Sequence, residues 1–77
     1  MDKARREKLK DALRYLSTVI IIVDQVFDKE EECLDNVPEN LTGTEQYEKM
    51  ESALESLDEA MERLDEAKVC IQDAMAR

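Results

Sequence analysis

Carboxylates offer more potential chemistry than any other side chains in this sequence. Eight of them are clustered in the second half of the chain: Glu48, Glu51, Glu55, Asp58, Glu59, Glu62, Asp65 and Glu66. Helical bundles bind metals through inward-pointing carboxylates and Glu-x-x-His pairs, but this chain has no histidine. The glycine-centred acidic loop of an EF-hand is also absent. We therefore expect a solvated acidic face with no metal and no cofactor; a specific cation site is the alternative.

Nucleophilic catalysis lacks a base in this chain. A serine nucleophile needs a neighbouring general base, and histidine, the commonest one, does not occur. Ser17, Ser52 and Ser56 fall inside expected helices, without an oxyanion-hole motif. Tyr15 and Tyr47 occupy apolar positions of helical patterns, where packing is the expected role and stacking on bases is the alternative. We predict that the protein is not an enzyme.

The two cysteines, Cys33 and Cys70, are widely spaced and belong to no CxxC motif. This spacing indicates neither a zinc site nor a disulfide framework. Opposite ends of a helical hairpin would hold them, too far apart for a disulfide within one chain. We expect both to be small buried or half-buried apolar residues, with an intermolecular disulfide as the alternative.

The helices that carry these side chains are separated by a segment that holds the only proline and the only glycine. Pro38 disfavours a helical conformation at the preceding residue, so the first helix is predicted over about 2–36. A turn over 37–44 follows, with one short helical turn at 38–41, and Val37 and Leu41 are expected to cover the end of the core. Thr44, or alternatively Thr42, caps a second helix over about 45–76. Residues 1–77 are thus predicted to form one all-α unit, an antiparallel two-helix hairpin of the coiled-coil type.

Two apolar stripes run along the first predicted helix. The inner stripe steps by three and four residues, as a coiled-coil seam does: Leu9, Leu13, Leu16, Ile20, Val23, Phe27 and Leu34. The outer stripe repeats this stepping one position over: Ala12, Tyr15, Val19, Ile22, Val26 and Cys33. A hairpin supplies a partner helix for only one of them. The surplus apolar surface therefore predicts self-association or another partner.

The second predicted helix carries one main seam, which only Lys68 interrupts: Tyr47, Met50, Leu54, Leu57, Met61, Leu64, Ile71 and Met75. An alanine ridge runs beside it at every seventh position: Ala53, Ala60, Ala67 and Ala74. Small side chains let helices approach closely, so we expect this helix to lie tight against the inner stripe. The outer stripe then meets its counterpart in a second copy, which predicts a homodimer, a four-helix bundle centred on Tyr15, Val19, Ile22 and Val26.

Charge is distributed unevenly along the chain. Residues 1–14 hold six basic and three acidic side chains, a local net charge of +3, whereas residues 28–66 hold three basic and fifteen acidic ones, a net charge of -12. Two hairpins with their turns at opposite ends would place each basic end near an acidic turn. An antiparallel dimer is therefore favoured, although exposed ion pairs contribute only about 0–1 kcal/mol each.

The overall charge of -9 also bears on partners. A nucleic-acid backbone or an anionic membrane surface would be repelled, while a basic protein would be attracted. No apolar run approaches the roughly 20 residues that cross a bilayer, and Met1 is followed by charged residues rather than by the apolar core of a secretory signal. A cytoplasmic location is expected.

The turn and the following helix carry a resemblance. The run Asp35-Asn36-Val37-Pro38-Glu39-Asn40-Leu41-Thr42-Gly43-Thr44-Glu45, with the Leu-Asp-Glu-Ala units after it, resembles a turn motif of small acidic helical-hairpin proteins from phages, mobile elements and Gram-positive bacteria. The resemblance covers residues 30–67. It implies a hairpin and a phage or prophage setting, and it implies no activity.

Two functions from different classes follow from these features. The first is a self-associating helical interaction or structural protein. The alternative is a small acidic inhibitor that occupies a basic nucleic-acid site on another protein, with acids between Glu30 and Glu66 imitating phosphate spacing. A third reading, in which the basic residues from Lys3 to Arg14 tether the protein to nucleic acid, requires that end to be exposed rather than paired.

Overall fold

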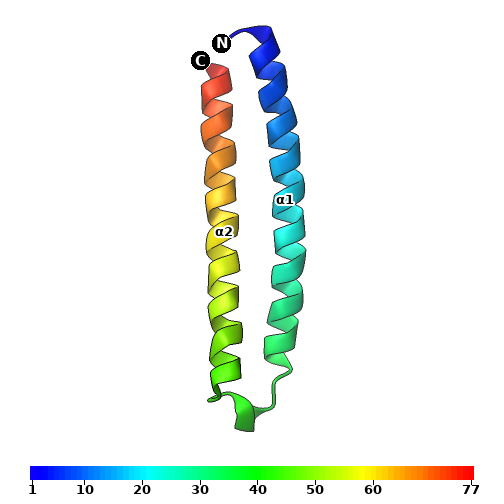
Figure 1. Ribbon diagram of the computed structural model, residues 1–77, viewed down its shortest axis with the longest axis vertical. Helices are drawn as coiled ribbons and strands as arrows, with labels where there is room; N and C mark the ends of the chain where they lie inside the picture. Colours follow the sequence, from blue (N-terminus) through cyan, green and yellow to red (C-terminus); the bar gives the residue numbers. More distant parts are fainter.

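The computed structural model describes residues 1–77, and its helices form an antiparallel hairpin (Figure 1). Helix α1 spans Lys3–Asp35, the short 3-10 helix η1 spans Glu39–Leu41, and helix α2 spans Glu45–Ala76. Both termini lie at one end of the hairpin and η1 lies at the other (Figure 1). The molecule is a rod of 59 × 15 × 13 Å. The predicted all-α two-helix hairpin is confirmed.

Both long helices begin at a side-chain cap. The Asp2 carboxylate accepts a hydrogen bond from the Arg5 backbone N–H at 2.9 Å, and the Thr44 hydroxyl accepts one from the Tyr47 backbone N–H at 3.2 Å. Each cap satisfies a backbone donor that has no partner within the first helical turn. Thr44 is therefore the predicted cap of the second helix, and its hydroxyl also donates to the Leu41 carbonyl at 2.8 Å.

The turn agrees with the prediction in its backbone and departs from it in one side chain. A single 3-10 turn forms after Pro38, and the Leu41 N–H donates to the Pro38 carbonyl at 2.9 Å. Val37 is half-buried, as expected, but Leu41 is 45% exposed, so the prediction that Leu41 covers the end of the core is wrong. Pro38 has an extended ψ of 143°, which breaks the helical path between the two residues, so they do not share a face.

The two helices meet along the predicted seams. Every residue of the inner stripe is half-buried, and so is every seam residue of α2, including Lys68. None of the 77 residues is fully buried, because each seam side chain has a helix on one side only. The packing of α1 on α2 therefore covers one apolar stripe partially and leaves further apolar surface open to solvent.

Candidate self-association surface

The outer stripe lies exposed along the middle of α1. Its four large residues, Tyr15, Val19, Ile22 and Val26, have exposed fractions between 42% and 67%. Ala12 is half-buried and so lies partly within the hairpin interface, while Cys33 is exposed. The apolar surface is continuous from Tyr15 to Val26 and ends at charged residues on the same face, Lys8 before it and Lys29 after it. A monomer therefore exposes a patch of large apolar side chains with charged ends.

The outer stripe and the alanine ridge share one side of the hairpin. Each outer-stripe residue directly precedes an inner-stripe residue, as Val19 precedes Ile20, and each alanine directly precedes a seam residue of α2, as Ala60 precedes Met61. Antiparallel helices turn in opposite senses when viewed from one end, so residues displaced the same way from facing seams fall on the same side. We call this side, with the outer stripe and the alanine ridge, the apolar side.

The alanine ridge is covered only at its centre. Ala60 and Ala67 are half-buried, whereas Ala53 and Ala74 are exposed. The alanine ridge was predicted to let α2 lie close to α1. Only two of its four alanines are partly covered by that packing. The other two present small side chains to solvent beside the outer stripe. The exposed Lys49, Ser56 and Arg63, which also directly precede seam residues, share this side of α2 with the alanines.

The opposite side of the hairpin is acidic. Carboxylates there directly follow seam positions on both helices, where the half-buried Glu30 continues the inner-stripe spacing between Phe27 and Leu34. We call the following set the acidic side: Asp24, Asp28, Glu31, Glu51, Glu55, Asp58, Glu62 and Asp65. A shallow hollow between the helices shows that carboxylates from both α1 and α2 lie close together on this side. Glu31 of α1 and Asp58 of α2 line its rim, and Phe27 and Leu54 line its apolar part. Like charges therefore face one another across the groove.

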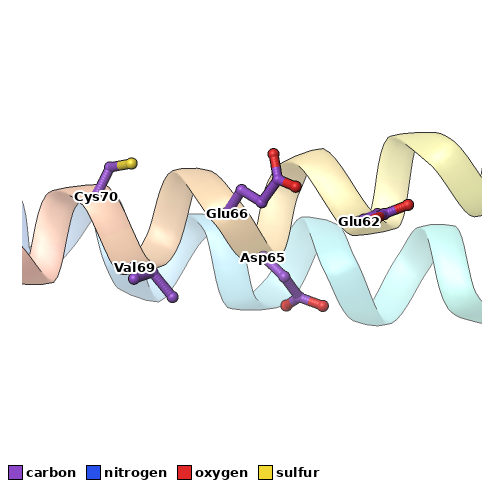
Figure 2. A pocket seen from close by; sticks show the side chains of 5 residues that line it. All are labelled: Glu62, Asp65, Glu66, Val69 and Cys70. Carbon is purple, nitrogen blue, oxygen red and sulfur yellow. The ribbon is translucent and has the colours of Figure 1, made fainter.

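The largest hollow of the molecule lies on α2 alone, and its side chains do not converge. It is lined by Glu62, Asp65, Glu66, Val69 and Cys70. Figure 2 shows Cys70 and Glu66 projecting to one side of the helix and Asp65 and Val69 to the other. The eight carboxylates singled out from the sequence are all exposed, and no three acidic or cysteine side chains are grouped so that they could hold a metal ion. This hollow lacks the convergent polar groups of a ligand site.

Both cysteines are exposed free thiols. The expectation that they are buried or half-buried apolar residues is wrong. Cys33 belongs to the outer stripe, which α2 does not cover, and Cys70 projects from α2 away from the seam (Figure 2). Burial of a small apolar residue on a helix requires a neighbour on that side, and a hairpin supplies none there.

The hairpin interface contains no ion pair. All six ion pairs join residues three or four apart within one helix or between a helix and its N-cap, the shortest being Arg14 with Asp11 and Arg63 with Glu59, each at 2.6 Å. Exposed pairs of this kind contribute about 0–1 kcal/mol. Apolar packing therefore holds α1 against α2, and most of the excess carboxylates remain unpaired on the surface.

Two exposed apolar residues belong to no pattern in the sequence. Ile21 and Val69 are 57% and 54% exposed, and both directly follow seam positions, which places them on the acidic side. Isolated exposed apolar residues are ordinary on protein surfaces, so they differ from the continuous outer stripe. No helical periodicity could have identified them, because neither has apolar neighbours at a spacing of three or four on its own face.

Neither long helix contains a stretch that is apolar over enough residues to cross a bilayer. Comparisons with protein-family models, with curated proteins and with solved structures find no match for this chain.

Proposed function

We propose that this protein is a non-enzymatic helical interaction protein that self-associates through the outer stripe. Two hairpins pack with their apolar sides together and form a four-helix bundle. The observation that carries this proposal is the exposure of Tyr15, Val19, Ile22 and Val26 as one continuous surface beside a covered seam. A two-fold interface uses the same patch on both chains, so each copy covers the outer stripe of the other.

The energetic case rests on how little the hairpin buries alone. Full burial of a large apolar side chain contributes about 1.5–3 kcal/mol, and a two-fold dimer covers four such side chains in each copy. A chain of this size has few other sources of stability, since no residue of the hairpin is fully buried. Association thus supplies the missing core. On the resemblance of residues 30–67, we also propose a phage or prophage setting and a cytoplasmic location for the protein.

The test compares solution mass by light scattering at several protein concentrations for three proteins. The native chain is expected to be a dimer. The Val19→Asp/Val26→Asp variant, which puts charge into the outer stripe, is expected to be monomeric. The control Ile21→Asp adds one carboxylate at an exposed apolar position of the acidic side and is expected to remain a dimer. A native chain that stays monomeric at every concentration contradicts the proposal.

A second function is favoured by a separate observation. Carboxylates of α1 and α2 gather on one side of the hairpin, and none of them is paired across the helices. Such a surface suits a small acidic inhibitor that covers a basic nucleic-acid site on another protein. This alternative predicts retention on an immobilised basic nucleic-acid-binding protein and release by DNA. Equal retention of a Glu55→Gln/Asp58→Asn/Glu62→Gln variant would contradict it, because these neutralisations remove charge from that side.

A further inference from the structure

The order of residues along the outer stripe specifies how two copies fit together. We propose that the dimer, which rests on the function proposed above, is antiparallel, with α1 packed against α1 of the second copy and the two-fold axis passing between Val19 and Ile22. Val19 then lies opposite Ile22 of the second copy, and Tyr15 lies opposite Val26. The small Ala12 lies opposite Lys29, and Lys8 lies opposite Cys33. Large apolar residues thus meet at the centre of the contact between the two α1 helices, and charged residues lie at both of its ends.

Symmetry leaves two main arrangements for hairpins that face each other through their apolar sides. If the two turns lie at the same end, α1 of one copy lies over α2 of the other. If the turns lie at opposite ends, α1 lies over α1 and α2 over α2. The Tyr15-to-Val26 stripe is centred between Val19 and Ile22, close to the midpoint of α1, which spans Lys3–Asp35. Only the second arrangement packs the whole stripe of one chain against the equivalent stripe of the second chain, so that no part of either stripe stays exposed.

Charge separates the two arrangements further. Residues 1–14 have a net charge of +3 and residues 28–66 a net charge of -12, and most of these acids lie in the half of the rod that contains the turn. Turns at the same end would bring the acidic halves together, whereas turns at opposite ends bring each basic end beside an acidic turn. Along the contact between the two α1 helices, Lys8 then lies near Glu30 of the second copy, and Lys29 lies near Asp11 of the second copy. None of the four has a hydrogen-bonded or ionic partner on the other helix of its own hairpin.

The same axis also meets the middle of the alanine ridge. The hollow lined by Phe27 and Glu31 of α1 and by Leu54 and Asp58 of α2 shows that residues near 29 are level with residues near 56. Because the helices are antiparallel, a point between Val19 and Ile22 is level with the stretch from Ala60 to Ala67. The two α2 helices of the dimer therefore cross between Ala60 and Ala67, whose small side chains allow close packing, with Arg63 between them on the same side. The ridge that is only partly used within the hairpin becomes part of the dimer interface.

Spin labels on the chain's own surface measure this arrangement directly. One protein carries a label at the native exposed Cys33 in a Cys70→Ser background. The other carries a label at Gly43→Cys, with both native cysteines replaced by serine; Gly43 has open space around it and lies in the turn, away from the outer stripe. With a helical rise of 1.5 Å per residue and helices 8–10 Å apart, the antiparallel dimer predicts label separations of about 40 Å for Cys33 and about 55 Å for position 43.

The possible results have distinct meanings. Dimers with both long distances support the antiparallel arrangement. Dimers with both distances under about 20 Å would place the turns at one end, which overturns this inference while leaving self-association intact. Labelled proteins whose scattering mass is that of a monomer at every concentration would overturn both. A label at Cys33 lies on the outer stripe and could itself prevent dimerisation. The label at position 43 lies in the turn, so it still reports the arrangement of the dimer in that case.

Discussion

The apolar side and the acidic side of the hairpin are made by the same two helices, on either side of the same seam. Residues that directly precede seam positions include the outer stripe and the alanine ridge, with polar residues such as Ser56 and Arg63 between the alanines, whereas those that directly follow seam positions, such as Glu55 and Asp58, are mostly carboxylates. Water solvates the acidic side well, and like charges there resist close approach by another copy. The apolar side gains from being covered. The asymmetry teaches that a heptad pattern can leave one face of a helix pair apolar and open to a partner while like charges on the opposite face resist one.

The largest effect is expected where the seam itself is attacked. Ile20→Asp places a charge between the helices, where the residue is half-buried, and should remove most of the helical circular dichroism at every concentration, with a loss of more than about 3 kcal/mol. Its neighbour Val19→Asp lies on the apolar side and should instead weaken association. If both variants lost helix equally at high concentration, the distinction between seam and apolar side would be untenable.

A charge on the alanine ridge tests the difference between the two sides on α2 rather than on α1. Ala60→Glu gives the apolar side a carboxylate beside its centre and should weaken dimerisation by more than about 100-fold, measured by sedimentation equilibrium. Gln72→Glu adds the same charge on the opposite side of α2, directly after the seam residue Ile71, and serves as the matched control. Equal weakening by both variants would assign the effect to net charge rather than to the surface.

A truncation of one apolar side chain should have a smaller effect. Ile22→Ala removes apolar area from the centre of the outer stripe and should weaken dimerisation by about 10- to 100-fold, given about 0.8 kcal/mol per buried CH₂. Ile21→Ala removes the same atoms one residue earlier, on the acidic side, and should leave the dissociation constant unchanged. A similar shift for the two variants would show that helix stability, not coverage of the stripe, controls association.

The smallest effect is expected on the acidic side. Glu31→Gln/Asp58→Asn removes two like charges that line one hollow between the helices and should raise the free energy of unfolding by a few tenths of a kcal/mol, up to about 1 kcal/mol. Thermal unfolding at low and high salt provides the measurement. The gain should shrink as salt screens the repulsion. A gain that does not depend on salt would mean that charge repulsion is not its cause.

Helical periodicity was enough to predict the hairpin and its seam. The inner stripe from Leu9 to Leu34 and the seam from Tyr47 to Met75 are half-buried because a spacing of three and four residues puts them on one face. Pro38 and Thr44 marked the turn for local reasons of backbone geometry and capping, which act independently of the rest of the fold.

Exposure away from the seam was harder to predict. Cys33, Cys70 and Leu41 have apolar character, yet each is exposed, because coverage depends on whether an element lies next to that side of the helix. The extent to which the alanine ridge is covered depends on how far apart the helices lie, which side-chain volumes along the whole seam decide together. The candidate surface could be recognised from the sequence as surplus, but finding that its centre is level with the stretch from Ala60 to Ala67 required the register of the two helices.

The short connection through η1 also determines how this chain is expected to fold. In a hairpin, the residues that meet near the turn are close in sequence, and each further pair toward the termini adds only a small increment of loop-closure entropy. Folding should therefore start where η1 joins the helices and proceed toward the open end, with rates typical of helical proteins rich in local contacts. Because acidic residues crowd that starting point, added salt should speed refolding, and the chain ends should be the last part to become protected from hydrogen exchange.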